Sequence, residues 1–251
     1  MAMGLDIVID GDASANNAGF IPPLTDSLEY WNFFGGTEAA NRNLAPGKSN
    51  GTLVGAPVAN AHSHLFRQGV NYIRTGVPET YEMTFVAIAK SRRTVADSQA
   101  GDEYIISNYQ ASGGPDASNT GSSLMFRNRT AGTNTYQQAM LTTTNSGVQT
   151  RSVPADIDLS PAMLIGQHTL ATKTIKVSAT AGNLSGAFTD ATIYRSGAFN
   201  IGSLGATTPV LTVDLEIYFA AIFSKYLSTT EITTLQTYLR SYYGRYIATP
   251  L

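Results

Sequence analysis

Hydrophobic and polar residues alternate along most of the chain after residue 27, and this period of two predicts short β-strands. Residues 83–90, MTFVAIAK, are instead apolar on both faces, which predicts a central strand that is covered on each side. Short segments of the same kind, separated by Gly, Asn or Pro, continue to about residue 204. They predict an all-β fold, a two-sheet antiparallel jelly roll or sandwich.

One helix is expected, near the C-terminus, where the hydrophobic period changes to that of a helix. Ser228 and Glu231 have the spacing of a capping box, in which each side chain bonds the backbone N–H of the other. Gly244 stands where a left-handed residue often ends a helix. The apolar stripe of this helix is predicted to consist of Ile232, Leu235, Leu239 and Tyr242.

Residues 1–26 differ from the rest of the chain and are expected to form an N-terminal arm. They combine acidic residues and glycine with the stiff pair Pro22-Pro23, so they cannot bury much apolar surface alone. We expect the arm to order against a partner, with residues 27–251 forming the jelly-roll domain. The N-terminus lacks the basic region of a secretory signal, and no segment approaches the length of a membrane span.

The composition narrows the classes of protein. The chain has 251 residues, which is enough to bury a large core without disulfide bonds, and it has no cysteine. Its 16 basic and 18 acidic residues are well mixed, so we expect no nucleic-acid partner. The sequence Gly47-Lys48-Ser49 is similar to the end of a phosphate-binding loop. However, position 42 is Arg where that loop has glycine, and a predicted strand follows where it needs a helix.

Four segments in order resemble the laminin-G-like branch of the concanavalin A-like lectin/glucanase superfamily. They are SNGTLVGAP at 49–57, LFRQGVNYIRTGVP at 65–78, MTFVAIAK at 83–90 and AAIFSKYLSTTEITTLQTYL at 220–239. The resemblance implies a concanavalin A-like jelly roll with one C-terminal helix, a fold associated with sugar binding. Gln68 and Ile88 depart from the Asp and Trp that are frequent in the family, which weakens any transfer of a ligand or calcium site.

The strongest candidates for catalysis are Asp214 and Glu216, because residues two apart on a strand share a face. Related glucanases carry catalytic acids as Glu-x-Asp-x-Glu on one strand, and this chain lacks one of the three. We therefore expect no enzyme activity. A glucanase-type glycoside hydrolase using Asp214 and Glu216 is the alternative. A metal site formed by His62 and His64 lacks further ligands at suitable spacing, so no cofactor or metal is expected.

Two oxygen-rich segments leave calcium binding open, although neither has the regular spacing of a calcium loop. One contains Asp97, Asp102 and Glu103, and the other contains Asp116 and Asn119. The single tryptophan, Trp31, could stack on a sugar, but its place on an alternating strand favours a core position.

Sugar binding needs aromatic faces and planar polar groups, and residues 108–136 contain both. The predicted carbohydrate-binding residues are Asn108, Tyr109, Gln110, Asp116, Asn119, Arg127, Arg129, Asn134 and Tyr136. An ordinary solvated loop region has a similar composition, so the prediction requires that these side chains converge in a cleft.

The low charge, the lack of cysteine, the missing secretory signal and the distinct arm together favour a non-enzymatic virion protein with a lectin-like domain. A bacteriophage tail, baseplate or fibre component is such a protein. Its expected partners are a bacterial surface glycan, other virion proteins through the arm, and further copies of itself in a homo-oligomer such as a trimer. Assembly in the host cytoplasm and release by lysis would follow. A purely structural decoration protein is a further alternative.

Overall fold

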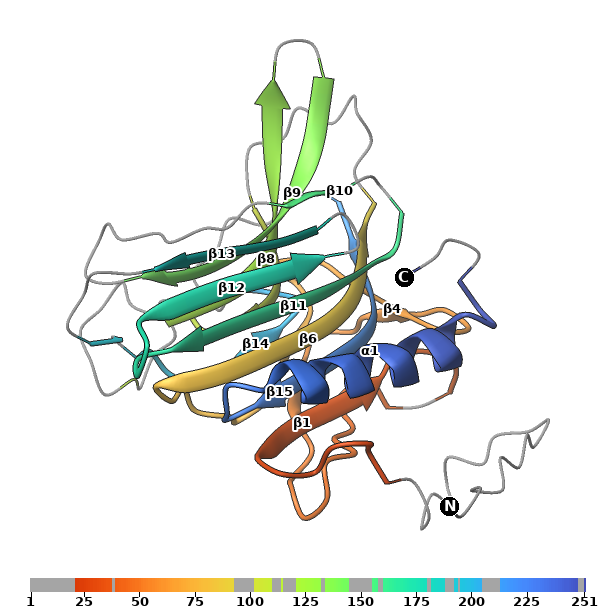
Figure 1. The fold of residues 1–251 in the computed structure, drawn as a ribbon. Coiled ribbons are helices and arrows are strands. Elements are labelled where there is room, and N and C mark those ends of the chain that lie inside the picture. Colours follow the sequence, from red (N-terminus) through yellow and green to blue (C-terminus); the bar gives the residue numbers. More distant parts are fainter. Residues whose placement is uncertain are drawn as a thin grey trace.

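The structure is a computed structural model of the chain. It describes residues 21–37, 39–92, 102–109, 114, 121–131, 134–144, 155–157, 160–179, 182–187, 192–193, 195–204, 213–247 and 251. Strands in two antiparallel sheets face each other, and one helix covers the outer side of one sheet (Figure 1). The predicted two-sheet antiparallel β-sandwich with a C-terminal helix is confirmed. Residues 1–20, most of the predicted arm, lie outside the described part.

The first sheet, sheet A, carries the helix. Its strand order is β13 (Gly182–Ala187), β12 (Thr174–Ala179), β11 (Ala162–Thr169), β6 (Glu82–Ser91), β15 (Leu215–Phe223), β4 (His64–Phe66) and β3 (Val58–Ala59). Strand β1 (Leu28–Phe33) also pairs with β15. The central strands β6 and β15 are thus far apart in sequence and adjacent in space.

The second sheet, sheet B, closes the other side of the core. Its order is β10 (Ala155–Ile157), β9 (Asn134–Thr144), β8 (Gly121–Ala131), β7 (Glu103–Ser107), β14 (Asn200–Ile201), β5 (Tyr72–Arg74) and β2 (Thr52–Val54). The ends of β8 and β9 extend beyond the sandwich as a hairpin (Figure 1).

Strand β6 explains why the molecule has two apolar cores. Its alternate residues Phe85 and Ala87 face sheet B, whereas Val86 and Ile88 face outward. All four are fully buried, which confirms the predicted central strand. Because its outer face is also apolar, sheet A needs a cover on that side.

Helix α1 (Thr229–Tyr243) provides this cover. The predicted capping box is present: the Glu231 N–H donates to Ser228 Oγ at 3.3 Å, and the Ser228 N–H donates to Glu231 Oε2 at 2.8 Å. The buried stripe consists of Ile232, Leu235, Leu239 and Tyr243. No helix in the described ranges is long and apolar enough to cross a membrane.

Two details of the helix prediction were wrong. Tyr243, not Tyr242, completes the buried stripe, because the Tyr243 ring packs against Tyr218 and its hydroxyl donates to the Tyr218 carbonyl oxygen, whereas Tyr242 is 38% exposed. Gly244 has a right-handed φ of −59°, since the chain continues into a further turn. A Cβ at Gly244 would approach the Arg240 carbonyl oxygen to 2.7 Å, so close packing accounts for the glycine.

A buried polar network joins the two sheets at one end of the sandwich. The Glu79 carboxylate accepts hydrogen bonds from the Ser122 hydroxyl of β8, from Asn108 Nδ2 at 2.8 Å and from the Ser196 N–H at 3.1 Å. His168 Nε2 on β11 lies 3.3 Å from Ser122 Oγ and 3.7 Å from Glu79 Oε1. Burial raises the pKa of Glu79 and lowers the pKa of His168 to about 4.

We expect Leu235→Ala to reduce the free energy of unfolding by about 2–4 kcal/mol, because Leu235 is fully buried between α1 and sheet A. Urea denaturation of the variant and of the wild type measures this difference. Thr234→Ala, on the exposed side of the same helix, is the control and should change stability by less than about 0.5 kcal/mol. Equal effects of the two substitutions would contradict the packing of α1.

The buried His168 should make the fold lose stability in mild acid. Below its unfolded pKa of 6.5, the unfolded chain binds a proton that the folded chain excludes until about pH 4. Between pH 7 and 5 this linkage costs about 2 kcal/mol. The raised pKa of Glu79 acts in the opposite direction, because the folded state then binds the extra proton.

Comparison with a His168→Gln variant isolates the histidine contribution. Urea midpoints at pH 7 and 5 should fall less in this variant than in the wild type. His62→Gln, at an exposed position, is the control for replacing a histidine by glutamine outside the buried network. If all three proteins show the same dependence, His168 does not titrate as the structure indicates.

Candidate binding surface

Asn108, the first residue of the predicted carbohydrate-binding set, has a structural role. It is fully buried. Its Nδ2 donates to Glu79 and to the Gly197 carbonyl oxygen, and its Oδ1 accepts from the Ser122 N–H at 2.7 Å. The amide therefore orients the buried Glu79 carboxylate, and its placement on a sugar-binding surface was wrong.

The other predicted residues are spread along β8 and β9. Arg127 forms a two-point pair with Asp102, Nε to Oδ1 at 3.2 Å and Nη2 to Oδ2 at 3.1 Å. The strand register places Arg129 opposite Tyr136 and Asn134 at the distal end of the hairpin. Tyr109 is half-buried near the opposite end of β8. Nine residues of β8 separate Ser122, beside Asn108, from Ala131, opposite Asn134, so at roughly 3.3 Å per residue the two ends of this set are roughly 30 Å apart. Gln110, Asp116 and Asn119 lie outside the described residues.

The candidate catalytic acids are each held by an arginine. Glu216 accepts from Ser63 Oγ at 2.7 Å and from Arg92 Nη1 at 3.1 Å. Asp214 accepts from Arg67 Nε at 2.8 Å. Both acids thus have the same kind of partner, a partly exposed arginine.

The two candidate metal ligands point to different places. His64 is buried beside the rings of Phe34 and Phe66, whereas His62 is exposed and stacks on Tyr246. Among the residues that the structure describes, no group of three or more His, Asp or Glu residues is arranged to hold a metal ion.

Two further candidates also have protein partners. Asp102 pairs with Arg127, and Glu103 accepts from Ser91 Oγ at 2.7 Å. The remaining residues considered for calcium, Asp97, Asp116 and Asn119, are outside the described ranges. Trp31 is fully buried and packs edge-on against Phe219 with ring centroids 4.7 Å apart, which confirms its core position.

A row of tyrosines follows one side of α1 and continues past its end. Tyr238, Tyr242 and Tyr246 are four residues apart, and we refer to them as the tyrosine row. Tyr242 stacks on Phe33 with centroids 4.6 Å apart, and Tyr246 stacks on His62 at 4.0 Å. Tyr242 and Tyr246 nevertheless remain 38% and 46% exposed. Both rings are thus half-exposed, and stacking on Phe33 and His62 restrains their orientation.

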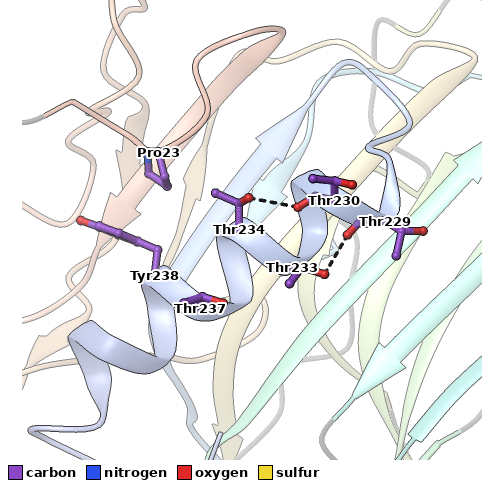
Figure 2. Close-up of a pocket in the computed structure, with 7 residues that line it drawn as sticks. All are labelled: Pro23, Thr229, Thr230, Thr233, Thr234, Thr237 and Tyr238. Atoms are coloured by element: carbon purple, nitrogen blue, oxygen red, sulfur yellow. Dashed lines mark hydrogen bonds between the residues drawn. The ribbon is translucent and has the colours of Figure 1, made fainter. Parts of the chain in front are cut away.

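A groove of about 570 Å³ lies beside the first member of this row, between α1 and the segment before β1 (Figure 2). Pro23 faces the helix across it (Figure 2). The hydroxyls of Thr233 and Thr234 donate to the carbonyl oxygens of the preceding turn, at 2.9 and 3.0 Å, so they are already satisfied. No lining residue is charged. The lining comprises Pro23, Thr229, Thr230, Thr233, Thr234, Thr237 and Tyr238.

Beyond the end of α1, the outer face of sheet A becomes charged. Glu216 on β15 lies opposite Lys90 on β6, and arginines follow the ends of β6 and β4. We call the five residues Arg67, Lys90, Arg92, Asp214 and Glu216 the charged cluster.

One loop connects the charged cluster to the tyrosine row. Asn60 and Ser63 donate hydrogen bonds to Glu216, while His62 between them stacks on Tyr246. The groove thus adjoins the tyrosine row at Tyr238, and the loop at residues 60–63 links the other end of the row to the charged cluster. Only the four-residue spacing of the tyrosines could have indicated this surface from the sequence.

No protein-family model matches the chain, and neither does any curated protein sequence. Solved structures with the same fold do match. The receptor-binding domain of botulinum neurotoxin D has a TM-score of 0.58 at 13% identity, covering 86% of this chain and 54% of that one. Trypanosoma rangeli sialidase in complex with sialic acid has a TM-score of 0.54 at 10% identity, covering 83% and 32%.

A third match is the botulinum neurotoxin serotype D ligand binding domain in complex with N-acetylneuraminic acid. Its TM-score is 0.59 at 14% identity, covering 86% of this chain and 52% of that one. The chain thus spans about half the length of the toxin domains and about a third of the sialidase. The likeness shows a shared β-sandwich fold.

If Asn108 is structural, Asn108→Ala should destabilise the fold by about 2–4 kcal/mol, because it removes one of the three donors to the buried Glu79 carboxylate and the partner of the Ser122 N–H and of the Gly197 carbonyl oxygen. Thermal unfolding measures the loss. Tyr109→Ala, at the neighbouring half-buried position, is the matched control and should cost less. A fully stable Asn108→Ala protein would show that the network does not support the fold.

Proposed function

We propose that this chain is a non-enzymatic, lectin-like module that binds a carbohydrate on the tyrosine row. The observation that carries the proposal is the pair of half-exposed rings, Tyr242 and Tyr246, which stacking on Phe33 and His62 holds in place. A sugar presents apolar C–H faces that pack on such rings. Because the rings are already ordered, little conformational entropy is lost on binding.

The uncharged groove supports the same class of ligand. Small-molecule sites are concave and mostly apolar, with a few polar groups that fix orientation. Threonine methyls, the Pro23 ring and the Tyr238 ring give the groove this character. Structural neighbours described with N-acetylneuraminic acid and sialic acid add support for a glycan as the ligand class, although they share only the fold with this chain.

A binding role also fits the state of the two candidate catalytic acids. Each is ion-paired with an arginine, so each carboxylate already has a partner within the protein. Several matched structures are binding domains rather than enzymes, which agrees with this interpretation.

We place the module in a bacteriophage virion, as a tail, baseplate or fibre component that contacts the host surface. The low charge, the absence of cysteine and the distinct arm at residues 1–26 support this context. The arm attaches the module to other virion proteins, and a homo-oligomer such as a trimer carries several copies. Single domains then bind weakly, near 1 mM or about −4 kcal/mol, while several copies on one particle raise the avidity by orders of magnitude.

Removal of the exposed rings should weaken glycan binding without unfolding the protein. For Tyr242→Ala with Tyr246→Ala, we expect an affinity loss of about tenfold or more on a glycan array, with the domain displayed in many copies. Tyr81→Ala is the matched control. Tyr81 is also half-exposed, at 42%, but it precedes the first residue of β6 and so lies at the end of this strand away from the charged cluster. Thermal unfolding confirms that all three proteins are folded.

The same experiment tests the non-enzymatic role. The bound oligosaccharides should remain intact on prolonged incubation. Hydrolysis that disappears in Glu216→Gln would establish the glycosidase alternative. If the multivalent wild type binds no glycan and does not block adsorption of its particle to host cells, only the structural decoration role remains.

A further inference from the structure

We propose that the charged cluster binds the carboxylate of an acidic sugar, a sialic or uronic acid, whose ring lies against the tyrosine row. This inference rests on the proposed function and specifies the class of glycan. It adds an ionic contact to the stacking surface described above. The arginines Arg67 and Arg92 are the groups that recognise the carboxylate.

The exposure of the ion pairs leaves the arginines accessible. The side chains of Arg67 and Arg92 are 41% and 49% exposed, whereas those of their partners Asp214 and Glu216 are 27% and 9% exposed. The arginines are therefore more accessible to solvent than the acids that they pair with, most clearly in the pair of Arg92 and Glu216. A ligand that approaches this face from solvent can reach both guanidinium groups.

The hydrogen bonds to the acids use only part of each guanidinium group. Arg67 donates through Nε to Asp214, and Arg92 donates through Nη1 to Glu216. A guanidinium group has five N–H donors, so both arginines keep donors that can bind a second carboxylate. The acid paired with each arginine restrains the side chain, which lowers the entropic cost of binding a ligand.

The local charge also favours an anion. Three basic residues of the cluster, Arg67, Lys90 and Arg92, face two acidic ones, which gives a local excess of one positive charge. The whole chain has a formal net charge of −2. The charged cluster is thus a positive site on an acidic protein.

The position of the loop at residues 60–63 favours an acidic sugar over a free anion as the ligand. Ser63 of this loop donates to Glu216 in the charged cluster, and His62 stacks on Tyr246 in the tyrosine row. One loop therefore connects the carboxylate-binding groups to an aromatic ring. An acidic sugar needs both kinds of contact, because it has a charged group attached to a ring with apolar faces.

The simpler explanation is that the arginines only neutralise Asp214 and Glu216. The two explanations differ in their dependence on the charge of the ligand. Ligand-observed NMR titrations would compare N-acetylneuraminic acid and galacturonic acid with the methyl esters of the same sugars. We expect the esters to bind about tenfold more weakly, because esterification removes the charge-assisted hydrogen bonds. Binding of the free acids should weaken between 20 and 300 mM NaCl.

Paired substitutions keep the test independent of folding. Arg92→Gln with Glu216→Gln removes both charges of one ion pair together, so no buried carboxylate is left unpaired. Arg67→Gln with Asp214→Asn does the same for the other pair. We expect each double variant to lose most of the preference for acid over ester while it retains its thermal stability. Lys173→Gln is the control, because it removes a positive charge far from the charged cluster. Lys173 lies in the turn after Thr169, which pairs with Glu82 at the other end of β6 from Lys90.

Three results are informative. A preference for the acids that both double variants lose supports the inference, and the type of sugar that binds separates sialic from uronic acid. Equal binding of acids and esters, or a preference that survives in the double variants, overturns the inference and leaves the proposed function intact. If neither charged nor neutral sugars bind the wild type, the proposed function fails together with the inference.

Discussion

Burial of apolar side chains on both faces of sheet A is the constraint on which the rest of the structure depends. Sheet B covers the inner face, and α1 covers the outer face through the stripe that ends at Tyr243. Because α1 packs on β6 and β15, the segments before and after the helix also lie on the outer face of sheet A. Strand β1 lies beside α1 (Figure 1). The ring of Phe33 on β1 then stacks on Tyr242, and His62 of the loop at residues 60–63 stacks on Tyr246.

Where α1 ends, sheet A continues, and its outer face changes from apolar to charged. Val86 and Ile88 lie under the helix, whereas Lys90 and Arg92 follow them on the same side of β6. The strand thus extends from the second core into a surface that ion pairs stabilise. On this surface the tyrosine rings stack on Phe33 and His62 and the arginines pair with carboxylates before any ligand arrives, which is the pre-organisation that the proposed binding role requires.

The polar network at the other end of the sandwich has a different purpose. Glu79, Ser122 and His168 bring together an acid, a hydroxyl and an imidazole, groups that in an open site could act in catalysis. Here they are fully buried and bind one another and the backbone. Their effect is to connect β8 with β11, and in acid the buried His168 should weaken the sandwich while Glu79 acts in the opposite direction.

The sequence by itself determined the class of fold, the central strand β6, the capping box of α1 and the core position of Trp31. These follow from local hydrophobic period and local hydrogen-bonding chemistry. Only the tertiary structure decided which side chains meet at the surface. Asn108 was expected on a binding surface and is buried, while Tyr242 was expected in the core and is exposed. The physical reason is that strand pairing between distant segments decides which residues become neighbours, and a local pattern does not contain that information.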